Sequence, residues 1–79
     1  MSKMVHYEGN PMVPRIVEHF VRLIESGELR PGDDLPTGPE IGKAFGTYPN
    51  VVVTARKELV RRNLVEVYKT AAKSGTRVK

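Results

Sequence analysis

Apolar residues recur at helical spacing in the first third of this 79-residue chain. They lie at i, i+4, i+7 and i+8, the spacing of one helix face, as Ile16, Phe20, Leu23 and Ile24. Pro14 suits a first helical turn, whose N–H groups have no partner within the helix, and Gly27 suits the position after a helix end. The pattern predicts a helix over about residues 13–26.

A second, shorter helix is predicted to begin after Thr37. Thr37 and Glu40 have the spacing of a capping box, in which each side chain accepts a hydrogen bond from the backbone N–H of the other residue. We expect this helix to run to about Phe45 and to end at Gly46. Its expected buried residues are Ile41, Ala44 and Phe45.

A third helix is predicted over about residues 49–62. Pro49 suits its first position, with Tyr48 or Thr47 as the cap, and Asn63 can adopt the left-handed conformation that ends it. An inward face is formed at i, i+3 and i+7 by Val52, Ala55 and Leu59. The outward positions in its first half are expected to be Asn50, Val51, Val53, Thr54 and Lys57.

The rest of the chain predicts a turn and a hairpin. In the connector between the first two helices, Pro31 and Gly32 suit a turn that directs Leu29 and Leu35 into the core. Residues 64–70 are rich in β-formers, residues 71–75 suit a flexible tip, and residues 76–79 suit a returning strand. The order predicts an α+β winged helix-turn-helix of three helices and a C-terminal β-hairpin, the wing.

Domain organisation and cellular setting follow from length and composition. We expect a loose N-terminal arm over residues 1–10 and one domain over residues 11–79, since so short a chain supports a single small core. The chain has no cysteine, no signal-peptide pattern and no apolar run near the ~20 residues of a membrane span, which fits a cytoplasmic protein without a membrane partner.

Charge is divided unevenly along the chain. Residues 1–40 hold four Lys/Arg and seven Asp/Glu, a net −3, whereas residues 41–79 hold nine and two, a net +7. Such an asymmetry is expected of a protein that presents one face to a polyanion, although a solvated basic face gives the same pattern.

Catalytic, cofactor and metal sites are not predicted, because His6 and His19 are isolated and the chain has no phosphate-binding or nucleophile motif. No small-molecule site is evident.

Several motifs together resemble the DNA-binding domain of the GntR family of bacterial transcription regulators, over about residues 11–78. They are Ser-Gly-Glu-Leu-Arg-Pro-Gly-Asp at 26–33, Leu-Pro-Thr at 35–37, Glu-Ile at 40–41, Phe-Gly at 45–46, Val52, Ala55, Leu59, Leu-Val at 64–65 and Gly-Thr at 75–76. The chain departs from the family at Pro39, Pro49 and Val53, where members usually carry arginine, and at Lys73-Ser74-Gly75-Thr76, where they usually carry Gly-x-Gly-Thr. The resemblance implies a regulator that binds double-stranded DNA, in many members through a domain followed by an effector and dimerisation domain.

In this reading, helix 49–62 enters the major groove and the wing at 69–78 meets the backbone or the minor groove. The candidate DNA-binding residues are Thr37, Tyr48, Asn50, Val53, Thr54, Lys57, Arg61, Lys73, Ser74 and Arg77. Asn50 either pairs with an adenine or faces water, and Tyr48 either donates to a phosphate or packs on the turn before the helix. The methyl groups of Val53 and Thr54 are candidates for contact with a thymine methyl. Lys57 is expected to reach a guanine edge or a phosphate, and the other cations either contact phosphate or are solvated.

The functional alternatives are a winged-helix protein-interaction module and an architectural recombination factor without strong base readout. The valine run at 51–53 and the missing arginines favour the first of these. For the DNA-binding reading, one domain makes few contacts, so we expect a homodimer or adjacent copies on DNA. The operator, the effector, the direction of regulation, and whether the chain stands alone are left open by the sequence.

Overall fold

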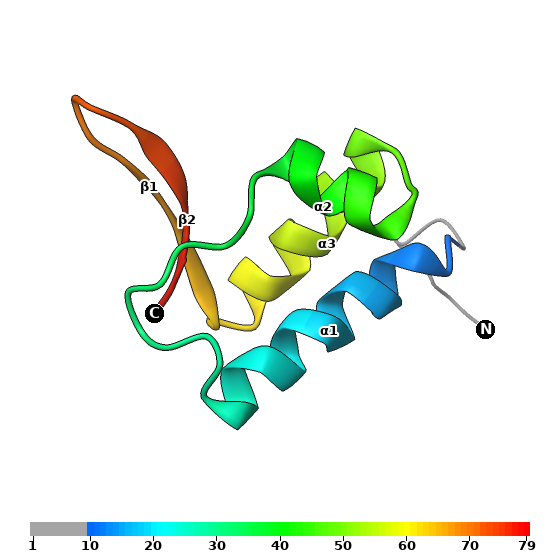
Figure 1. The fold of residues 1–79 in the computed structure, drawn as a ribbon, viewed down its shortest axis with the longest axis horizontal. Helices are drawn as coiled ribbons and strands as arrows, with labels where there is room; N and C mark the ends of the chain where they lie inside the picture. Colours follow the sequence, from blue (N-terminus) through cyan, green and yellow to red (C-terminus); the bar gives the residue numbers. More distant parts are fainter. Residues whose placement is uncertain (1–9) are drawn as a thin grey trace.

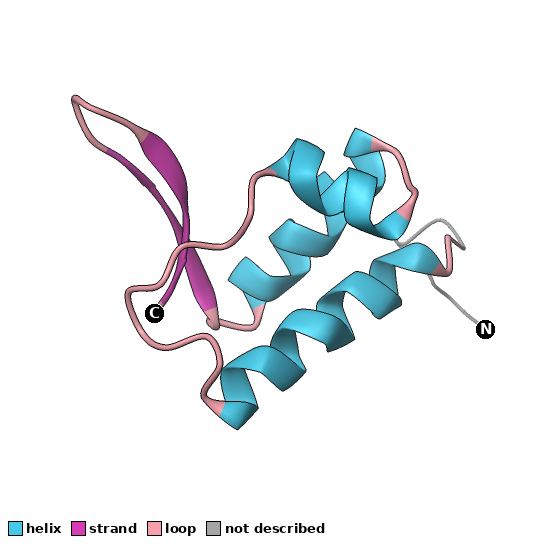
Figure 2. Cartoon of the chain, viewed as in Figure 1, coloured by secondary structure: helices cyan, strands magenta, loops and turns pink. Residues whose placement is uncertain are grey.

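A computed structural model of the protein describes residues 10–79, and the predicted arm lies outside the described residues except for Asn10. Three helices are followed by an antiparallel hairpin (Figure 1). The elements are α1 (Met12–Ser26), α2 (Gly38–Phe45), α3 (Pro49–Arg61), β1 (Val65–Lys69) and β2 (Ser74–Val78). The hairpin projects away from the helices, as the wing of a winged helix does (Figure 2).

The helix ends follow local rules. The capping box at Thr37 is present, and Gly27 (φ 85°) and Gly46 (φ 63°) end α1 and α2 in the left-handed conformation that glycine adopts at little cost. The helix begins at Met12, one residue before the predicted start, and Pro14 is its third residue, within the first turn as predicted. The side-chain oxygen of Asn10 accepts a hydrogen bond from the Met12 N–H (2.8 Å), which satisfies one amide of the first turn.

The core lies where α1, α2 and α3 meet the base of the hairpin. Its fully buried large side chains are Val13, Ile16, Val17, Val52, Leu59 and Val65. Two predictions about burial were wrong. Val51 was expected to face outward but is only 5% exposed, because α1 and α2 together cover a broad arc of α3. Ala44 was expected inside but is exposed, and Gly42 takes the inward position on α2 against Val52.

The connector between α1 and α2 holds the hairpin to the body. Leu35 is buried and its N–H donates to the carbonyl of Thr76 (2.8 Å), while the Val78 N–H donates to the carbonyl of Asp33 (2.9 Å). Asp34 thereby forms a β-bridge with Arg77. At the base of the wing, β2 therefore pairs with β1 on one side and with the connector on the other. This pairing holds the wing in a fixed position beside α2.

The tip of the hairpin is shorter than predicted. β1 and β2 pair from Val65 with Val78 up to Lys69 with Ser74, so the returning strand begins at residue 74 and not at 76. The turn at residues 70–73 is closed by the Thr70 N–H, which donates to the Lys73 carbonyl (2.7 Å), and by the Lys73 N–H, which donates to the Thr70 hydroxyl (3.0 Å). The expected flexible tip at 71–75 is thus a hydrogen-bonded turn followed by strand.

Candidate nucleic-acid interface

The outer face of α3 carries the first group of candidate residues. α3 buries Val51, Val52, Ala55, Glu58 and Leu59 on one side. On the opposite side, Asn50, Val53 and Lys57 are exposed, each about one helical turn from the next. A helix that is covered on one side and open along the other has the shape needed to enter the major groove of DNA.

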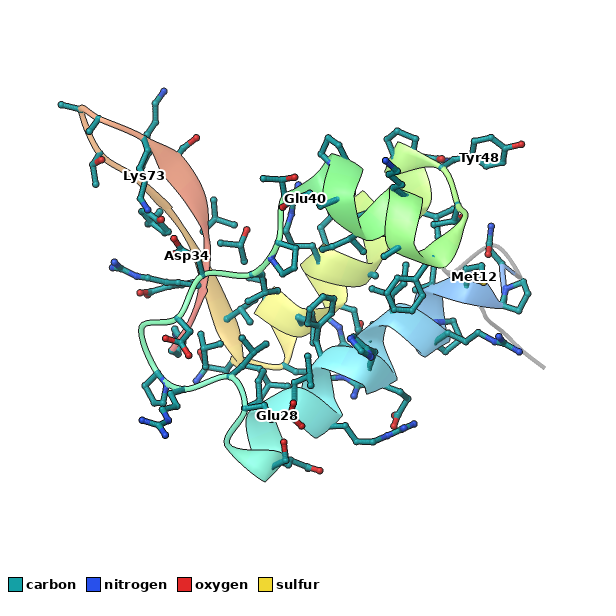
Figure 3. The ribbon with its side chains drawn as sticks, viewed as in Figure 1. Met12, Glu28, Asp34, Glu40, Tyr48 and Lys73 are labelled. Carbon is teal, nitrogen blue, oxygen red and sulfur yellow. The ribbon has the colours of Figure 1, made fainter. Side chains whose placement is uncertain are left out.

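Tyr48 and Thr54 flank this outer face. Tyr48 is 74% exposed and points away from the helical body, so it does not pack on the preceding turn (Figure 3). The Thr54 hydroxyl donates to the carbonyl of Asn50 (2.9 Å). That bond uses the hydroxyl hydrogen within the helix.

A polar cleft separates the start of α2 from the wing. Its volume is about 390 Å³, and it is lined by Asp34, Leu35, Pro36, Thr37, Gly38, Arg56, Tyr68, Lys73, Ser74, Gly75 and Thr76. Within the capping box, the Glu40 N–H donates to the Thr37 hydroxyl (3.3 Å), and the Thr37 N–H donates to the Glu40 carboxylate (2.8 Å). The fold brings the predicted residue Thr37 beside the adjacent pair Lys73 and Ser74, which lie far from it in the sequence.

Asp34 organises the wing side of this cleft. Its carboxylate accepts hydrogen bonds from the Tyr68 hydroxyl (2.9 Å) and from Lys73 Nζ (3.0 Å). These bonds, that of Lys73 first, hold the pKa of Asp34 below its ordinary value, and the same contact raises the pKa of Lys73. Figure 3 shows Asp34 where the connector crosses the hairpin and Lys73 nearer the tip of the wing. Lys73 was predicted as a phosphate contact, and in this structure it is already paired with a carboxylate.

Arg77 lies on the same side of the hairpin. Its guanidinium is 4.7 Å from the centre of the Tyr68 ring, and its Nε donates to the carboxylate of Glu66 (2.8 Å). That hydrogen bond raises the pKa of Arg77. Arg77 therefore helps to fix the wing, and its charge is partly balanced.

The far end of α3 holds a third cluster. Glu58 is only 5% exposed and accepts hydrogen bonds from Arg61 (2.7 and 3.0 Å) and Arg62 (2.8 Å). The bond from Arg61 contributes most to keeping the pKa of Glu58 below its ordinary value, against the opposing effect of burial. The Arg61 side chain is still 70% exposed, so it presents donors to solvent while paired.

Two residues of the interface were missed from the sequence, namely Asp34 and Tyr68. They are 34 positions apart, and nothing in the local pattern of either indicates that they meet. Residues 10–79 contain no group of three or more His, Cys, Asp or Glu side chains able to hold a metal ion. No helix within the same residues is long and apolar enough to cross a membrane.

A three-helix body with one open helix beside a β-hairpin defines the winged helix-turn-helix class of proteins. Within it, residues 13–78 match the model of the bacterial regulatory proteins of the gntR family, and the chain belongs to this family. This confirms the resemblance seen in the sequence.

Known relatives agree with this assignment. The chain is 33% identical over 58 residues to the HTH-type transcriptional repressor YtrA of Bacillus subtilis (strain 168), which covers 73% of this chain and 45% of YtrA. It thus spans less than half of that relative. The DNA-binding domain of AraR, solved with the operator ORR3, superimposes with a TM-score of 0.75 at 26% identity (87% of this chain, 80% of that one). A YtrA of Sulfolobus acidocaldarius, a GntR-family transcription factor, gives 0.70 at 25% identity, over 90% and 73% of the chains.

Proposed function

We propose that the protein is a transcription regulator that binds double-stranded DNA sequence-specifically through a domain formed by residues 11–79. The observation that carries the proposal is the open face of α3, which no element within residues 10–79 covers and which lies beside a wing held in place by the connector. Its family membership and the AraR domain solved with its operator support the same reading. In this proposal the protein acts by binding DNA and not by catalysis, and it does so in the cytoplasm.

In this proposal, base reading and phosphate contact belong to different parts of the surface. Asn50, Val53 and Thr54 meet base edges in the major groove, where each base pair has a distinct pattern of donors, acceptors and methyl groups. Lys57, on the same outer face, meets a guanine edge or a phosphate. Phosphates are also met by the other candidates, Thr37, Tyr48, Arg61, Lys73, Ser74 and Arg77. Arg56 joins this set, because its guanidinium lies close to Gly38 at the start of α2.

Tight binding requires more than one copy of the domain. The surface described is small, and a single winged helix reaches only one face of the duplex. We propose that two copies bind, as a homodimer or side by side on DNA, because linking two weak sites raises the overall affinity without new contacts.

The test is selection of bound sites from a random DNA pool, followed by affinity measurements over a range of salt concentrations. If about four phosphates are neutralised, log K should fall against log salt with a slope of about −3.6. Asn50→Ala should relax preference at one base pair, by roughly 1–3 kcal/mol of discrimination, whereas Lys73→Ala should weaken binding to all sequences alike. Equal losses on selected and random DNA from both variants would refute this division of roles.

A second candidate is a protein-interaction module on the same scaffold. It is favoured by three valines that are exposed in the structure, Val53 (37%), Val60 (40%) and Val67 (65%). This second function would be supported if the protein does not bind DNA, or if its binding does not depend on the salt concentration. Strong binding without base preference would support an architectural factor.

A further inference from the structure

The valine run at the start of α3 is split by the fold. Val51 (5% exposed) and Val52 (1%) pack inward, while Val53 is 37% exposed. Val53 is therefore the one member of the run whose methyl groups are presented outward. It follows Asn50 by three residues, which places the two side chains on adjoining parts of the same face.

An exposed valine on a helix adds little to the stability of the isolated domain. A β-branched residue loses side-chain rotamer freedom in a helix, and one that remains exposed is not repaid by burial. Val60 lies seven residues further along and is exposed to nearly the same extent (40%). It provides a matched position on the same face of the helix, about two turns beyond Val53 and nearly three turns from Asn50.

The surroundings of Val53 narrow what it can meet on DNA. The Thr54 hydroxyl donates within the helix to the carbonyl of Asn50, and α3 has no lysine or arginine before Arg56. The first two turns of α3 therefore offer one amide and an apolar surface, and the nearest cation on this face is Lys57, about one turn beyond Val53. In the major groove, the apolar group available to such a surface is the 5-methyl of thymine, and the bidentate partner of an asparagine is adenine.

Resting on the proposed function, we propose that Val53 is a specificity-determining residue that contacts the 5-methyl group of a thymine. The thymine lies within one or two base pairs of the adenine that Asn50 reads. Three residues advance about 4.5 Å along a helix, and successive base pairs are about 3.4 Å apart, so neighbouring side chains reach neighbouring pairs.

The experiment removes that methyl group alone. In the site selected by the wild-type protein, each thymine is replaced in turn by deoxyuridine, and affinity is measured by fluorescence anisotropy. One replacement should weaken binding about fourfold, which corresponds to roughly 0.8 kcal/mol for one methyl group removed from water. It should lie beside the base pair whose preference is relaxed by Asn50→Ala.

Two exposed variants complete the test. Val53→Ala should bind thymine and deoxyuridine sites with equal affinity, whereas Val60→Ala should keep the fourfold difference. Both remove the same atoms from similarly exposed positions, so a general effect on folding or helix stability would act on both. Far-UV circular dichroism verifies that each variant is folded.

The outcomes separate this inference from the function on which it rests. A selected site in which no thymine near the Asn50 position is sensitive to deoxyuridine overturns the role of Val53 and leaves DNA binding intact. The same holds if Val53→Ala keeps the sensitivity, because another group then reads the methyl. If no DNA is bound at all, the proposed function fails and the inference fails with it.

Discussion

Replacing Asp34 by asparagine should make the protein bind DNA more tightly. In the structure Lys73 Nζ lies 3.0 Å from the Asp34 carboxylate, and the phosphate contact proposed for Lys73 requires it to exchange this partner for a phosphate. When Lys73 moves to a phosphate, a counterion is released from DNA, but the Asp34 carboxylate is left without its cation. These two effects nearly cancel in the salt dependence of DNA binding. The asparagine amide oxygen can still accept from the Tyr68 hydroxyl, so the wing keeps one of its two side-chain ties to the connector.

The size of the effect follows from counterion release. One fully effective phosphate contact contributes about −0.9 to the slope of log K against log salt. Asp34→Asn should therefore steepen the slope by up to about 0.9, which corresponds to about eightfold tighter binding to a random-sequence duplex at 0.1 M salt. Fluorescence anisotropy between 0.05 and 0.3 M KCl measures both quantities.

The neighbouring aspartate provides a matched control. Asp33 accepts a hydrogen bond from the Arg30 N–H (2.9 Å) within its own turn, so Asp33→Asn changes net charge equally without releasing Lys73. Its slope should remain close to that of the wild type. Lys73 is not held back by Asp34 if Asp34→Asn binds no more tightly than Asp33→Asn, or if the two variants have equal slopes.

Two further predictions concern stability. Thr37→Ala should lower the free energy of unfolding by about 1 kcal/mol and the Tm by about 4–8 °C, because the Glu40 N–H loses its capping acceptor. Thr37→Ser should recover most of the lost stability. Thr54→Ala should leave the stability nearly unchanged. Equal losses for Thr37→Ala and Thr54→Ala in thermal denaturation would contradict the capping role. The pKa of Glu58 is held below its ordinary 4.5, so the ionised carboxylate stabilises the folded state at pH values above about 4.5. As the pH falls further this contribution is lost, and the free energy of unfolding decreases by about 1–2 kcal/mol. Urea unfolding from pH 6 to 3 should show a shallower decline for Glu58→Gln, and parallel curves would rule this out.

Local sequence determined where the helices begin and end. The capping box of Thr37 and Glu40 and the glycines at 27 and 46 act within a few residues, through hydrogen bonds and backbone conformations that depend on nothing distant. Asn63 (φ 65°) adopts the left-handed conformation one residue beyond Arg62, which caps the third helix. The family motifs add the winged-helix topology, so the fold was predictable before any side chain was placed.

Tertiary structure decided which side chains the interface presents. Val51 faces inward because α1 and α2 approach α3 from two sides and widen its buried arc beyond the stripe that helical periodicity marks. Asp34 meets Tyr68 and Lys73 because the connector pairs with β2, a long-range contact with no trace in local spacing. Periodicity gives the direction of a side chain relative to its own helix, whereas the partner of a charge depends on where the rest of the chain is packed.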